Sequence, residues 1–144
     1  MPQVIYRMDL LQDTLAKLCD SLEGAYAAVI VSIEGFVVAA YPPGDESFVE
    51  DGSGNANSSQ VAAMAATLVA LAERTLARLA QGDIERLLVD GQYGSMIVIP
   101  VSDSAAIAVL LEKGAKIGIG LYTVQYISQQ VRYILEGKSP PGLA

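Results

Sequence analysis

The strongest constraint in this sequence is a run of twelve residues, Val61–Ala72, that contains no charged residue and only one polar residue, Thr67. The run lies inside a stretch whose composition predicts a helix from about Ser59 to Ala80. A helix on the surface of a monomer normally has a polar face, but the first charged residue here is Glu73. We therefore expect this helix to be covered on two sides, by the fold on one and by a partner on the other.

A rotation of about 100° per residue divides this helix into a face of large residues and a face of small ones. The large face is expected to pack against the core: Val61, Met64, Leu68, Leu71, Ala72, Leu76 and Leu79. The small face is expected to meet a partner helix: Ala63, Ala66, Thr67, Ala70 and Ala77. The alternative is that alanine, the strongest helix former, fills an exposed face. We prefer the interpretation that a partner covers the small face, because an outer helix face without charges over three turns is uncommon in a monomer.

The composition predicts one compact domain, residues 1–144, that needs neither disulfide nor metal to fold. Apolar residues make up 52% of the chain and charged residues 17%, which argues against disorder. The formal net charge is −7, and the nine basic residues are scattered, so we expect no nucleic-acid binding and no attraction to an anionic membrane. An acidic protein of this kind favours a basic partner surface.

The single cysteine, Cys19, excludes an internal disulfide and is expected to fill space in the core. The first ten residues lack the pattern of a signal peptide, and the uncharged run is shorter than the roughly 20 residues that span a bilayer. These features predict a cytoplasmic protein without membrane insertion.

Apolar spacing and turn residues predict the order of the elements. Leucines up to Leu22 mark a first helix from Met8, with Asp9 and Gln12 placed as a capping box and Gly24 as its stop. A hairpin of strands 25–32 and 36–41, turned by Gly35, is predicted next, and an acidic mobile loop, 42–58, connects it to the helix described above. Three strands follow, at 83–90, 94–101 and 105–112. A last helix ends at Glu136 and Gly137 and is followed by a flexible tail, 137–144; its apolar positions are Leu121, Val124, Ile127, Val131 and Ile134. The prediction is an α+β domain, core about 8–135, in the order α-β-β-α-β-β-β-α, whose five-stranded antiparallel sheet carries helices on both faces.

This order resembles the roadblock/dynein light chain family over roughly residues 8–135. The segments that carry the resemblance are the hairpin IVSIEGFVVAA, the helix AAMAATLVALAERTL and the run IERLLVDGQYGSMIVIPVSDSAAIAVLLEKGAKIGIG. The resemblance implies homodimers or heterodimers in which the second helices and the adjacent third strands pair across a two-fold axis. It would place Ala63, Ala66, Ala70 and Ala77 at or near that axis and would make Ile84 to Asp90, with Ile84, Arg86 and Leu88, the paired edge.

Members of the family such as the bacterial gliding-motility regulators of the MglB type act on a small Ras-like GTPase, and others scaffold GTPases or join dynein to cargo. The resemblance therefore implies a non-enzymatic dimeric adaptor or regulator that binds such a GTPase and modulates its nucleotide state or placement. The alternative is a scaffold subunit of a larger cytoskeletal or signalling assembly without a GTPase. A small-ligand sensor has least support, since the chain has two phenylalanines and no tryptophan to build a stacking site.

The sequence offers little catalytic chemistry. It has no histidine, which argues against a Ser/His/Asp or Cys/His arrangement, and we expect no cofactor and no metal. The glycines of GAKIGIG, residues 114–120, lack the Walker spacing, so a structural turn is favoured over a phosphate loop. Arg74 and Arg78 share a face beside Glu73 and could reach into a GTPase site, although basic residues at a helix end are more often only solvated.

Overall fold

The computed structural model describes residues 2–44, 46–48 and 56–137, with side chains from residue 8 onward. The elements are α1 (Pro2–Ser21), β1 (Ala25–Ser32), β2 (Val37–Tyr41), α2 (Ser58–Arg78), β3 (Leu87–Asp90), β4 (Gly94–Ser102), β5 (Ala105–Glu112) and α3 (Ile117–Leu135). The five strands form one antiparallel sheet in the order β2-β1-β5-β4-β3. The predicted α+β class and element order are confirmed.

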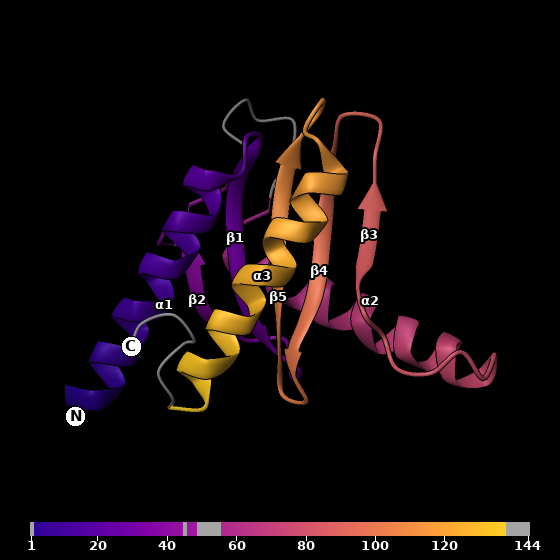
Figure 1. Cartoon of the computed structure of the whole chain (residues 1–144), viewed down its shortest axis with the longest axis horizontal. Coiled ribbons are helices and arrows are strands. Elements are labelled where there is room, and N and C mark those ends of the chain that lie inside the picture. The colour runs from indigo at the N-terminus through magenta and orange to yellow at the C-terminus, as the bar shows by residue number, and fades with distance from the viewer. Residues whose placement is uncertain (1, 45, 49–55, 138–144) are drawn as a thin grey trace.

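The helices cover the two faces of the sheet unequally. Figure 1 shows α1 and α3 in front of the sheet and α2 behind it. Side chains alternate along each strand, so Ile97 and Ile107 join the core beneath α1 and α3, whereas Val98 and Ala108 join a smaller core beneath α2. Because α2 packs mainly against β1, β2 and β5, its side of the sheet is less well covered over β3 and β4.

The first helix begins earlier than the sequence predicts. Since α1 starts at Pro2, Asp9 and Gln12 lie inside the helix, and the predicted capping box there is wrong. Gln12 has another role, because its Nε2 donates a hydrogen bond of 2.6 Å to the carbonyl oxygen of Ala40 in β2. The predicted stop is confirmed, since Gly24 follows the helix with a φ of 92° that favours glycine.

The first hairpin forms as predicted, with Gly35 at a φ of 94° in its turn. Part of the predicted acidic loop, residues 45 and 49–55, lies outside the described residues, and so does the tail beyond Gly137.

The third strand is shorter than predicted. β3 begins at Leu87, so the predicted strand residues Ile84 and Arg86 lie in the segment before it, and only Leu88 lies in the strand. The pairing of β3 with β4 runs from Asp90↔Ser95 to Leu87↔Val98. Two residues further along β4 stands Pro100, which has no amide hydrogen, and the pairing of β4 with β5 shifts register just beyond it. Residues 83–86 lie outside the pairing of β3 with β4.

The glycine run before the last helix begins with a turn at Gly114, which has a φ of 91°, and then enters the helix. α3 begins at Ile117, which places Gly118 and Gly120 in its first turn. A Cβ on the buried Gly120 would lie 3.5 Å from Ile97 Cδ1 and 3.6 Å from Leu22 Cδ2, so glycine lets α3 approach the sheet closely. Gly120 therefore serves packing, whereas a Cβ on Gly118 would meet nothing within 4 Å. The predicted end of the helix at Glu136 and Gly137 is confirmed.

Candidate interaction surface

The helix α2 starts at a well-formed cap and packs through small side chains. Asn57 Oδ1 accepts a hydrogen bond from the Gln60 amide, and Gln60 Oε1 accepts one from the Asn57 amide, each at 3.0 Å. The residues of α2 that are buried against the sheet are Ser58, Val61, Ala62 and Ala65. The sheet opposes them with small residues of its own, which include Ala40, Ala106 and Ala108. Small residues on both sides allow the helix and the sheet to approach closely.

This packing corrects the predicted faces of α2. Val61 is buried as predicted, but Met64, Leu71 and Leu79 are 50%, 58% and 62% exposed, so the prediction that they pack in the core is wrong. At about 100° per residue, the helix is rotated by roughly a fifth of a turn from the predicted orientation. The reason is that the sheet surface beneath α2 has room for alanine and valine, whereas longer side chains would hold the helix away from it.

The rotation leaves large apolar side chains on the outside of the helix. We call Met64, Leu68, Leu71 and Leu79 the apolar stripe; Leu68 is half-buried and the other three are exposed. On the same side of the sheet, Leu87, Met96 and Leu110 are half-buried and Val89 is 40% exposed. Nothing in the described part of the chain covers this surface fully, and exposed apolar side chains in such number mark an interaction site.

The strand β3, at one edge of the sheet, is a second exposed feature. It is the last strand of the sheet order and pairs only with β4, so its outer backbone groups are available to another strand. Leu88 and Val89 are 42% and 40% exposed. A short edge strand with exposed apolar side chains is suited to pairing with a second chain.

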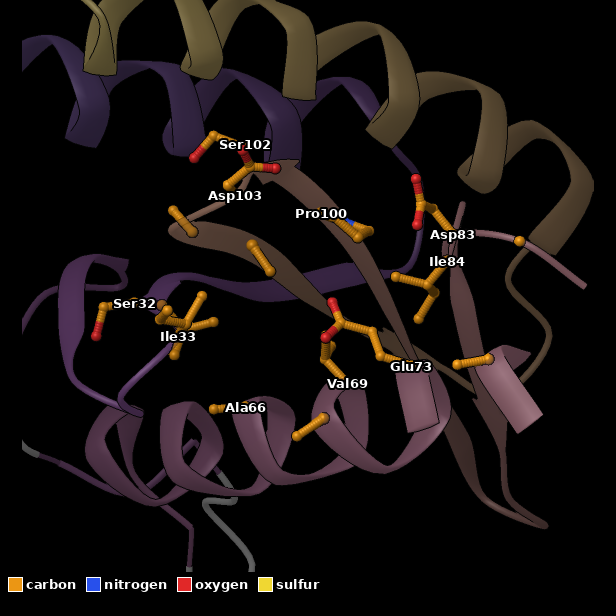
Figure 2. Close-up of a pocket in the computed structure, with 16 residues that line it drawn as sticks. Ser32, Ile33, Ala66, Val69, Glu73, Asp83, Ile84, Pro100, Ser102 and Asp103 are labelled. Carbon is orange, nitrogen blue, oxygen red and sulfur yellow. The ribbon is translucent and has the colours of Figure 1, made fainter. Parts of the chain in front are cut away.

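On its other flank, α2 borders a cavity of about 550 Å³. The helix contributes Ala66, Ala70, Glu73 and Ala77, and the opposite wall comes from the ends of β1, β4 and β5. Figure 2 shows Glu73 reaching from α2 into the space between helix and sheet, with Asp83 and Asp103 at opposite sides of the opening. The cavity is open because the small residues of α2 do not fill it.

The structure thus divides the predicted site residues into two groups. Ala66, Ala70, Glu73 and Ala77 come together around the cavity. Ala63, Thr67, Arg74 and Arg78 are exposed and do not line it. The Thr67 hydroxyl donates a 2.8 Å hydrogen bond to the Ala63 carbonyl, so it is satisfied within the helix.

The sequence analysis missed the apolar stripe as a surface and the cavity altogether. The signal for the cavity was the spacing of Ala66, Ala70, Glu73 and Ala77, which places a single carboxylate among alanines on one flank.

No catalytic centre emerges from the described residues. They contain no group of three or more His, Cys, Asp and Glu side chains that could hold a metal. Burial raises the pKa of the Cys19 thiol to about 11, with a smaller contribution from the charge of Asp20, so the thiol stays protonated near neutral pH and is a poor nucleophile. No described helix is long and apolar enough to cross a membrane. The surfaces around α2 are suited to binding.

Comparison with known proteins identifies the architecture. The family model of the Roadblock/LC7 domain matches residues 11–111. Two uncharacterized proteins of Methanocaldococcus jannaschii are each 24% identical over 102 residues, which cover 71% of this chain and 78% of each relative. The Roadblock/LC7 domain from Streptomyces avermitilis is similar with a TM-score of 0.73 and 20% identity, over 87% of this chain and 97% of that one. The gliding protein MglB from Thermus thermophilus is similar with a TM-score of 0.75 and 16% identity, over 91% and 92%.

Proposed function

Because the chain belongs to the Roadblock/LC7 domain family, we propose that it is a regulator or adaptor that dimerises through α2 and β3 and, as a dimer, binds a small Ras-like GTPase. The observation that carries the proposal is the apolar stripe. Three of its four large side chains are at least half exposed, and burying them against a second chain removes apolar surface from water. The proposed dimer modulates the nucleotide state or the placement of the GTPase.

A two-fold arrangement accounts for both exposed features at once. In an isologous dimer the same patch serves on both subunits, so a stripe on one α2 packs against the stripe of its twin. Pairing of the two β3 strands across the axis would join the sheets of the two protomers and satisfy the outer edge of each. The unpaired edge of β3 and the apolar stripe support this arrangement, because the described part of the chain leaves both uncovered.

Two alternative sets of α2 residues could form the dimer interface. The stripe, centred on Leu71, is our proposal from the structure. The predicted small-residue set, Ala63, Ala66, Thr67, Ala70 and Ala77, remains a second proposal for the surface that meets the twin helix. The two sets lie on different flanks of α2, so single substitutions separate them.

The charged end of α2 is proposed to contact the GTPase. Glu73, Arg74 and Arg78 are exposed, and neither arginine forms an ion pair within the described part of the chain. An arginine free to move can stabilise the charge that develops during phosphoryl transfer. It can also serve only as a binding contact or a solvated helix end.

The test uses a purified Ras-like GTPase encoded in the same genome, loaded with GDP or with a non-hydrolysable GTP analogue. We expect saturable binding that prefers one nucleotide state, measured by calorimetry, and a changed rate of GTP hydrolysis or nucleotide exchange. Arg74→Ala and Arg78→Ala should reduce any stimulation of hydrolysis if either acts on the phosphate; unchanged stimulation removes that role. The absence of binding to every such GTPase would refute the partner and favour the alternative, a scaffold subunit of a larger assembly.

A further inference from the structure

We propose that the cavity between α2 and the sheet is a binding site for a positively charged side chain, arginine or lysine, carried on a short apolar segment of a partner protein. The cavity lies on the opposite flank of α2 from the apolar stripe. The inference therefore goes beyond the proposed function and holds whether or not the stripe pairs with a second copy.

The size of the cavity indicates a peptide segment rather than a single ion. Its volume of about 550 Å³ lies inside the range of roughly 300–1,000 Å³ that is usual for ligand sites. Much of its wall is apolar, with Val69 and Ala70 on the helix and Val31, Pro100 and Ala106 on the sheet. Such walls accept the aliphatic stem of a long basic side chain and its apolar neighbours.

The charge of the cavity specifies the head group of the ligand. Three carboxylates from separate elements surround the opening: Glu73 on α2, Asp83 in the segment before β3, and Asp103 in the β4–β5 turn. None of the sixteen residues that line it is basic. Within the described part of the chain, none of these three carboxylates forms an ion pair. A cation placed among them meets attraction from three directions, whereas an anion is repelled.

The rim of the cavity is held in place before any ligand arrives. The Ile33 amide donates to the Ser104 carbonyl oxygen at 3.0 Å, which ties the β1–β2 turn to the β4–β5 turn. The Ser104 amide donates to Ser102 Oγ at 3.2 Å, and this fixes the turn that carries Asp103. A preformed rim lowers the conformational cost of binding.

The turn that precedes Asp83 is also defined by hydrogen bonds. After α2, the Gln81 amide donates to the Leu76 carbonyl oxygen at 2.9 Å and the Ala80 amide donates to the Ala77 carbonyl oxygen at 3.2 Å. This pair of bonds is a Schellman motif, which reverses the chain and directs it back toward the sheet. Asp103 therefore sits on a hydrogen-bonded turn, and Asp83 lies two residues after another.

The experiment is an NMR titration of the full chain labelled with ¹⁵N, using two peptides that differ in one charge. The probe is acetyl-Val-Arg-Val-amide, and the control replaces arginine by citrulline, which has nearly the same shape and no charge. We expect saturable shifts at the amides of Ser32, Gly82 and Ser102 with the arginine peptide. If each carboxylate contributes as an exposed ion pair does, the citrulline peptide should bind about tenfold more weakly.

Protein variants locate the binding to the carboxylates. The double variant Glu73→Gln, Asp103→Asn should weaken the arginine peptide about fivefold, because two of the three exposed charges are lost. Glu34→Gln is the matched control, since Glu34 is an exposed acid in the β1–β2 turn that does not line the cavity. This variant should bind the arginine peptide with the affinity of the wild type. All of these substitutions are at exposed side chains and should leave the fold intact.

Three results would overturn the proposal. The first is equal binding of the arginine and citrulline peptides, and the second is full affinity in the double variant. The third is movement of the same amides on dilution without peptide, which would show that a second copy of the chain occupies the cavity. Loss of dimerisation alone would contradict the proposed function and leave this inference standing.

Discussion

Truncation of Leu71 measures how much the apolar stripe contributes to self-association. Leu71 is 58% exposed, so somewhat more than half of its burial remains to be gained in a dimer. Full burial of a leucine side chain stabilises by about 1.5–3 kcal/mol, so the gain at this position is about 1 kcal/mol for each protomer. A symmetric dimer contains two copies, so Leu71→Ala should cost about 2 kcal/mol of association free energy. That energy corresponds to a dimer dissociation constant about 30-fold higher than the wild type.

The assay is sedimentation velocity over a dilution series, with circular dichroism to confirm the fold. Leu71→Glu should dissociate the dimer further, because it would bury a charge at the axis. Ala70→Glu is the matched control on the cavity flank, and it should leave the dimer intact if the stripe forms the interface. A dissociation constant unchanged in Leu71→Ala, together with a monomeric Ala70→Glu, would refute the reasoning and support the small-residue face.

Four further predictions concern backbone geometry and the thiol. Ala80 has a φ of 54° in the turn after α2, so Ala80→Gly should raise the free energy of unfolding by about 0.5–1 kcal/mol in a urea melt, and no gain would contradict the left-handed turn. Gly24 has a φ of 92°, and a Cβ there would lie 2.7 Å from Ala115 Cβ, so Gly24→Ala should lower that free energy by about 2 kcal/mol; an unchanged melt would argue against this close approach. Because folding raises the pKa of Cys19 from 9.0 to about 11, the contribution of this thiol to folding stability should be constant below pH 9 and fall as the pH rises from there toward 11. Alkylation of the native thiol at neutral pH should accordingly be slower than in the urea-unfolded chain, and equal rates would contradict the burial.

Local sequence patterns predicted the elements well where each residue type has one structural meaning. Gly24 and Gly35 marked a helix end and a hairpin turn, and both adopt positive φ values. The strands β1, β4 and β5 were located within a residue or so, because their apolar runs are bounded by turns. The element order could be predicted because these glycines and turns mark the ends of the elements.

The errors arose where a pattern depends on its neighbours in space. Asp9 and Gln12 have the spacing of a capping box, but α1 extends before them, so the pattern had no helix start to cap. Residues 83–86 were predicted to belong to the third strand, but its pairing with β4 ends at Leu87↔Val98, two residues before Pro100, which has no amide hydrogen. Neither fact is contained in the local sequence.

The orientation of α2 was the most consequential error. When a helix is apolar over most of its circumference, the hydrophobic pattern does not define which arc faces the core. The choice depended on the sheet, whose small residues Ala40, Ala106 and Ala108 accept Ala62 and Ala65 but not larger side chains. The cavity was unpredictable for the same reason, because its volume depends on how the C-terminal half of α2 stands relative to the sheet.

The most direct test of the central claim, that the uncovered side of α2 and β3 meets a second copy, is the mass of the wild-type chain in solution. Sedimentation equilibrium at micromolar concentration should give twice the chain mass of 15.1 kDa, about 30 kDa. A mass of 15.1 kDa at every concentration would contradict the account.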